Sequence, residues 1–143
     1  MKGDVIVRKT LLTSVLAFLM ILVSVQSNQA SAADYYIGTN PDGTEAYLVT
    51  ESVRETMLSS NGYWSGYKYD CTVKSVYPES RKYYRDEYTF YCWSQGMPGW
   101  HKNGQRVSRQ EIWSKRDNGS IEWALYEFFW DYSRKLHPDQ WSR

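Results

Sequence analysis

Two alternating segments in the middle of the chain, residues 67–77 and 86–93, constrain its fold more than any other feature. In each segment every second side chain falls on the same face, as in a half-buried β-strand. The segments contain the only two cysteines of the chain, with a polar, basic turn between them. If Cys71 lies opposite Cys92 in an antiparallel hairpin, one face of that hairpin carries six side chains: Cys71, Val73, Ser75, Tyr88, Phe90 and Cys92.

The first 32 residues are predicted to be a secretory signal peptide. Lys2, Arg8 and Lys9 precede an apolar stretch at residues 11–25, and small residues follow at 30–32. The alternative is an uncleaved anchor, but a spanning helix needs roughly 18 or more consecutive apolar residues. Residues 33–143 would then form one small domain of a secreted, periplasmic or cell-envelope protein, with no stable membrane insertion.

Export would place both thiols in an oxidising compartment, where a cysteine pair is expected to be bridged. Directly opposed strand positions hold their Cα atoms about 4.5 to 5.5 Å apart, which is within disulfide reach. A redox dithiol would need the two cysteines close in sequence, and a zinc site would need further ligands. We therefore predict a structural disulfide between Cys71 and Cys92, and no metal site.

The charge of the predicted mature chain argues against nucleic acid as a partner. Residues 33–143 contain 14 basic and 15 acidic residues, whereas nucleic acids and anionic lipids favour a strongly basic face. The run at residues 81–85, "RKYYR", mixes cations with tyrosines as single-strand binders do. Because Asp86 and Glu87 follow it directly, we interpret it as a solvated hairpin tip.

Further strands are predicted on both sides of the central pair. Residues 35–39 and 44–49 are typical of a hairpin, since Pro41 and Gly43 suit the turn between them. The stretch 50–66 fits either a short helix capped by Thr50 or a strand that continues past a kink. A short strand is also expected at residues 110–114.

The hydrophobic period changes near the C-terminus. From Ser120 onward apolar residues recur at intervals of three and four, and Pro138 ends the pattern, which predicts a helix. We therefore predict an α+β fold: an antiparallel β meander of about five strands, with a C-terminal α-helix packed on one face and one cross-strand disulfide.

Aromatic residues are the main candidates for binding. The mature segment holds 23 of the 24 aromatics of the chain, more than one small core accommodates, so several should be exposed. On the predicted helix, Trp123, Tyr126 and Trp130 point away from the main apolar stripe, and they either form a platform or pack under residues 94–109. The candidate binding tryptophans are Trp64, Trp93, Trp100, Trp123 and Trp130.

Catalytic motifs are missing from the sequence. His101 and His137 do not form an H-x-x-x-H pattern, and there is no G-x-S-x-G motif. We predict no catalytic residues and no cofactor, and a non-catalytic module that binds an extracellular or envelope protein or glycan. Two alternatives stay open. One is a small secreted cell-wall hydrolase, with Glu111 and His101 as the first residues to test, and the other is an exported inhibitor of a hydrolase.

Three stretches carry a family resemblance: "AYLVTESV", "YDCTVKSVY" and "NGSIEWALYEFFWDY". Together they are similar to small exported bacterial proteins and loosely resemble the surface-adhesin E-like domains, whose characteristic strand residues 47–53 match approximately. The resemblance implies an exported, non-catalytic protein that is displayed or released at the cell envelope and binds host or matrix proteins.

Overall fold

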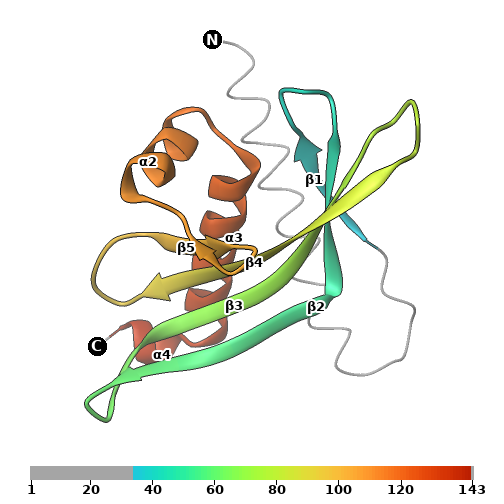
Figure 1. Cartoon of the computed structure of the whole chain (residues 1–143). Coiled ribbons are helices and arrows are strands. Elements are labelled where there is room, and N and C mark those ends of the chain that lie inside the picture. The colour runs from blue at the N-terminus through green and yellow to red at the C-terminus, as the bar shows by residue number, and fades with distance from the viewer. Residues whose placement is uncertain (1–33, 143) are drawn as a thin grey trace.

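A computed structural model describes residues 34–142, which form a six-stranded antiparallel sheet and three helices (Figure 1). The strands are β1 (Tyr35–Thr39), β2 (Glu45–Ser60), β3 (Tyr63–Val76), β4 (Tyr83–Trp93), β5 (Gly99–Lys102) and β6 (Gln105–Arg106). The helices are α2 (Arg109–Asp117), α3 (Ile121–Leu136) and α4 (Pro138–Trp141). Each strand pairs with the next in sequence, so the sheet is a meander. The predicted signal peptide, residues 1–32, lies outside the described residues.

The core lies between the sheet and α3, which crosses one face of it (Figure 1). Phe129 of α3 stacks on Tyr69 of β3 with ring centroids 4.8 Å apart, and it lies 5.6 Å from the ring of Phe90 on β4. The opposite face, called the outer face below, carries polar pairs such as Lys68 with Asp70. The sheet is therefore apolar on one side and polar on the other, as its alternating sequence requires.

The predicted C-terminal helix is confirmed as α3, together with its start. The hydroxyl of Ser120 accepts a hydrogen bond from the backbone N–H of Trp123 at 3.3 Å, so Ser120 is the N-cap. Glu122 lies in the first turn, and Arg134 and Lys135 lie in the last, where each charge complements the helix dipole.

The prediction of about five strands and one helix is wrong on both counts. The short strand predicted at residues 110–114 is also wrong: residues 109–117 form a helix, because Ser108 caps its first turn by accepting from the N–H of Glu111 at 3.2 Å. The ring of Trp113 then packs against that of Trp123 on α3, at 6.2 Å. Two short strands were not expected: β5 and β6 are joined by the two-residue turn Asn103–Gly104, whose φ angles are 51° and 77°.

Residues 50–60 continue as strand, which settles the choice left open between helix and kinked strand. The register between β2 and β3 shifts between Val49 and Arg54, so β2 carries a bulge there. Ser52 fills the gap: its hydroxyl donates to the carbonyl of Val49 and accepts from the N–H of Thr72 at 2.8 Å.

The predicted disulfide is not present, because β3 and β4 pair four residues out of the expected register. Cys71 lies opposite Tyr88, and Cys92 lies opposite Tyr67. Four residues along a strand correspond to about 13 Å, well beyond disulfide reach. The turn sets this register, since the N–H of Tyr77 donates to the carbonyl of Lys82 at 2.9 Å and β4 begins at Tyr83.

The face predicted for the six side chains of this hairpin is correct even though their pairing is not. All six are buried under α3: Cys71, Val73, Ser75, Tyr88, Phe90 and Cys92. A shift by an even number of residues changes which side chains are neighbours but leaves each one on its original face.

Candidate functional site

The five candidate tryptophans do not form one exposed platform. Trp100 is 2 % exposed and belongs to the core, whereas the other four are half-buried: Trp64, Trp93, Trp123 and Trp130. Trp64 and Trp130 both contact Trp141 of α4, with ring centroids 4.9 and 4.8 Å away. Trp123 packs between Trp100 and Trp113. The second aromatic stripe of α3 is thus covered partly by β5, α2 and α4, and not by the 94–109 loop alone.

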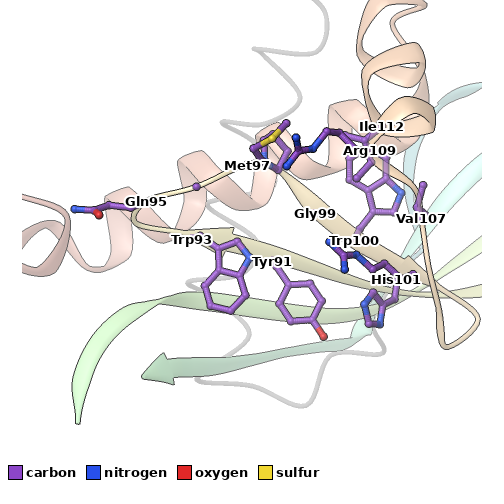
Figure 2. Close-up of a pocket in the computed structure, with 13 residues that line it drawn as sticks. Tyr91, Trp93, Gln95, Met97, Gly99, Trp100, His101, Val107, Arg109 and Ile112 are labelled. Carbon is purple, nitrogen blue, oxygen red and sulfur yellow. The ribbon is translucent and has the colours of Figure 1, made fainter. Parts of the chain in front are cut away.

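Trp93 and Trp100 share a cavity at the β5 edge of the sheet, with a volume of about 600 Å³. We call it the β5-edge cavity. Its walls come from the end of β4, the loop 94–98, β5, β6 and the first turn of α2. In Figure 2, Trp93, Tyr91 and His101 point to one side of the ribbon, and Met97 and Ile112 lie on the other side. Residues from both sides of β5 therefore line the cavity.

The outer wall of the β5-edge cavity is aromatic. Tyr91 and Trp93 are two residues apart on β4, so both side chains lie on the outer face, and their rings stack at 5.6 Å with an interplanar angle of 10°. The imidazole of His101 lies 5.2 Å from the ring of Tyr91. On the neighbouring strand β3, Gly66 lies opposite Trp93 and has no side chain that could occupy the space beside the indole ring.

The inner wall is apolar and fixed by the core. Trp100 contacts Phe90 at 5.8 Å and Tyr126 at 6.1 Å, and Ile112 of α2 is buried beside it. The N–H of Val107 donates to the carbonyl of Trp100 at 3.1 Å, which holds the segment between β6 and α2 against β5. The wall is consequently preformed, as the walls of small-molecule sites usually are.

The charged groups that line the β5-edge cavity are all cationic or potentially cationic. Arg106 of β6 lies opposite His101, and Arg109 lies in the first turn of α2, near the positive end of that helix. Both arginines are exposed, and neither forms an ion pair with another residue of the 34–142 segment. Among the described residues, no aspartate or glutamate lines the cavity. The site combines an apolar stacking surface with uncompensated positive charge.

Sequence reasoning missed Arg106 and Arg109, although part of the signal was present. The Asn103–Gly104 turn is recognisable, and a two-residue hairpin around it places residue 106 opposite residue 101. Arg109 could not be placed in the same way, because its position depends on α2, and the sequence pattern predicts a strand at residues 110–114 instead of this helix.

A second hollow, of about 330 Å³, follows the exposed side of α3 and is lined by Trp123, Tyr126, Glu127, Trp130 and Asp131. All of its lining comes from one helix. Burial raises the pKa of the Tyr126 phenol above its ordinary value, so this side chain stays neutral at physiological pH. The hollow offers two exposed carboxylates beside indole rings but no wall from a second element.

A third hollow, of about 280 Å³, lies between the β1–β2 turn, β4 and the start of α3. Its three acidic residues are engaged within the protein. Asp42 accepts from the N–H and hydroxyl of Thr44 at 3.0 and 2.7 Å. Asp86 contacts Lys102 at 3.5 Å and accepts from Asn103 at 2.8 Å, and Glu122 contacts Lys115 at 3.4 Å. Glu111, the residue considered with His101 for a hydrolase, lines none of these three hollows.

Over residues 34–142, no group of three or more histidine, cysteine, aspartate or glutamate side chains could hold a metal ion. None of the helices described is both long and apolar enough to cross a membrane. Comparison of the chain with protein-family models, curated proteins and solved structures finds no match.

Proposed function

We propose that this protein is an exported, non-catalytic binding module, that its ligand is a glycan, and that the β5-edge cavity is the binding site. The observation that carries the proposal is the stacked pair Tyr91 and Trp93 at the mouth of a cavity of about 600 Å³. Aromatic rings offer a rigid apolar surface on which the C–H face of a sugar ring can lie. The surrounding polar groups, from Gln95, His101 and the two arginines, suit its hydroxyls.

The size of the cavity favours a glycan over a protein ligand. Sites for small ligands are concave and occupy roughly 300 to 1,000 Å³, a range that includes this cavity. A stable protein partner usually covers about 800 Å² of each surface and needs a broad apolar centre. Here the aromatic contact area is narrow and set at a strand edge.

The lining of the cavity supports binding without turnover. Glycoside hydrolysis usually depends on two carboxyl groups on either side of the scissile bond. None of the described residues that line the cavity carries a carboxyl group. Export is proposed from the N-terminal pattern of basic, apolar and small residues, which is typical of secretory signal peptides.

The proposal is tested by screening the mature protein on a glycan array and then measuring affinity by titration calorimetry. Trp93→Ala should weaken binding of the best glycan about two- to tenfold, because loss of one stacking surface is worth roughly 0.5 to 1.5 kcal/mol. Tyr91→Ala should act in the same direction.

Tyr83→Ala is the matched control, since Tyr83 is 57 % exposed and lies at the opposite end of β4. This variant should bind as the unchanged protein does, and circular dichroism should show that all variants are folded. Absence of glycan binding, or unchanged affinity in Trp93→Ala, would refute the proposal.

A further inference from the structure

We infer that the glycan is acidic, with sugar carboxylates held by Arg106 and Arg109 at the rim of the β5-edge cavity. This inference rests on the proposed function and adds the chemical class of the ligand. It begins with the lining, whose residues in the described part of the chain include two arginines and one histidine and no carboxylate.

No ion pair within residues 34–142 neutralises the positive charge of this rim. The carboxylates nearest along β3 and β4 have other partners: Asp86 pairs with Lys102, Glu87 accepts from the hydroxyl of Thr72, and Asp70 accepts from that of Thr89. Glu111 follows Arg109 by two residues on α2, and side chains at that spacing point in different directions.

Arg106 and Arg109 bring two like charges to the lining of one cavity, and an anionic ligand bound there would offset both. A guanidinium group presents two parallel N–H donors that match the two oxygens of a carboxylate. Arg106 lies on a strand hairpin and Arg109 on a capped helix turn, so the backbones that carry both groups are fixed before binding.

The arrangement also specifies where the acid must lie on the ligand. Tyr91 and Trp93 lie at the end of β4, whereas Arg106 lies opposite His101 on β6 and Arg109 begins α2, beside Ile112 in Figure 2. A ligand that spans the cavity therefore needs an apolar ring face at one end and an anionic group at the other. Uronic-acid glycans carry an apolar ring face and a carboxylate within one or two sugar units.

The local charge is a property of the site and not of the whole protein. Residues 33–143 carry 14 basic and 15 acidic residues, so the domain has no general attraction for anions. Binding of an acidic glycan should therefore depend on these particular arginines.

The test uses matched ligands that differ only in charge: a galacturonic-acid hexamer, a hyaluronan hexamer, and the methyl-ester form of each, with a sulfated glycosaminoglycan hexamer as a further arm. Titration calorimetry should show at least tenfold tighter binding of a free acid than of its ester. Affinity for the acid should also fall as sodium chloride is raised from 50 to 500 mM.

Arg106→Gln and Arg109→Gln should each weaken binding of the acid at least fivefold and weaken binding of the ester by a clearly smaller factor, because the ester keeps only the contacts of its hydroxyls. Arg134→Gln, an exposed arginine of α3 outside the cavity, is the matched control and should bind both ligands normally.

The outcomes separate the two claims. If esters or neutral array glycans bind as tightly as the acids, or if the arginine variants keep full affinity for the acids, the inference is wrong and the proposed function stands. Binding of the sulfated glycan alone would show an anion site that does not select carboxylates, which also contradicts the inference. If neither the array nor any hexamer shows binding, the proposed function itself fails.

Discussion

Cys71 and Cys92 lie in the apolar layer between the sheet and α3, where they are 2 % and 0 % exposed. Burial raises the pKa of the Cys92 thiol to about 12 and moves that of Cys71 in the same direction. A neutral, inaccessible thiol is a poor nucleophile and reacts slowly with oxidants. Both side chains therefore act as small apolar residues of the core.

This placement predicts the thiol chemistry of the folded protein. With Ellman's reagent at pH 8 and no reductant, the native protein should release no more than a trace of the coloured product. In 6 M guanidinium chloride it should release two equivalents, because both cysteines are free. A protein that shows no thiols after unfolding would contradict the register described for β3 and β4.

Gly66 is required where β3 approaches β4 most closely. Its φ is +142°, and an added Cβ would lie far inside van der Waals contact with the carbonyl oxygen of Cys92. Gly66→Ala should lower the free energy of unfolding by at least about 2 kcal/mol, as the strain and the clash combine.

Urea denaturation followed by circular dichroism measures this loss. Gly99→Ala is the control, because Gly99 has no positive φ and nothing within 4 Å of an added Cβ. If the two variants had equal free energies of unfolding, β3 and β4 would be able to move apart at Gly66 without loss of stability, which would contradict this prediction.

The N-cap of α3 makes a separable contribution to stability. Ser120→Ala removes the acceptor for the N–H of Trp123 and should lower the free energy of unfolding by about 1 kcal/mol. Ser59→Ala, at an exposed position of β2, should change stability by less than about 0.5 kcal/mol. Both values are measured by urea denaturation, and a Ser120→Ala protein as stable as the unchanged one would contradict the assignment of the cap.

The strands and helices illustrate what sequence patterns can and cannot determine. Alternation located β3 and β4 and the buried face of each, because the face depends only on whether a position is odd or even. The same alternation could not distinguish Cys71 opposite Cys92 from Cys71 opposite Tyr88, since these registers differ by an even number of residues. The turn before Tyr83 selects between them through backbone hydrogen bonds.

Helix α2 was misjudged for a different reason. Its sequence carries a capping pattern, Ser108 followed three residues later by Glu111, but only Ile112 is buried. With so weak an apolar stripe, its position depends on the contact between Trp113 and Trp123. That contact joins two helices and cannot be inferred from the local period.

The candidate site was predictable only in part. Aromatic composition identified Trp93 and Trp100, which do line the β5-edge cavity. It also named Trp64, Trp123 and Trp130, whose rings mainly pack against other aromatics of the protein. Arg106 and Arg109 enter the site only because β6 and α2 fold back beside β5, which is a property of the whole molecule.

The domain as a whole should lose stability in alkali. Burial raises the pKa of two thiols and of the phenols of Tyr69, Tyr88 and Tyr126, whereas in the unfolded chain these groups ionise near pH 9 to 10. Their stabilising contribution is complete below pH 9, and it is lost as pH rises toward the folded-state values.

The slope of this loss is about 1.4 kcal/mol per pH unit for each group that has ionised only in the unfolded state. Guanidinium chloride denaturation at pH 8, 9.5 and 10.5 should therefore give steadily lower free energies of unfolding. A constant value over this range would mean that these side chains are accessible to water in the native state.

The meander order of the sheet has a consequence for how the protein reaches its fold. Since each strand pairs with the next one along the chain, most pairing requires only the closing of a short loop. Chains whose contacts are close in sequence fold faster than those that must join distant segments. Each hairpin of this sheet can therefore form from neighbouring segments of the chain as soon as both have been synthesised, without waiting for a distant strand.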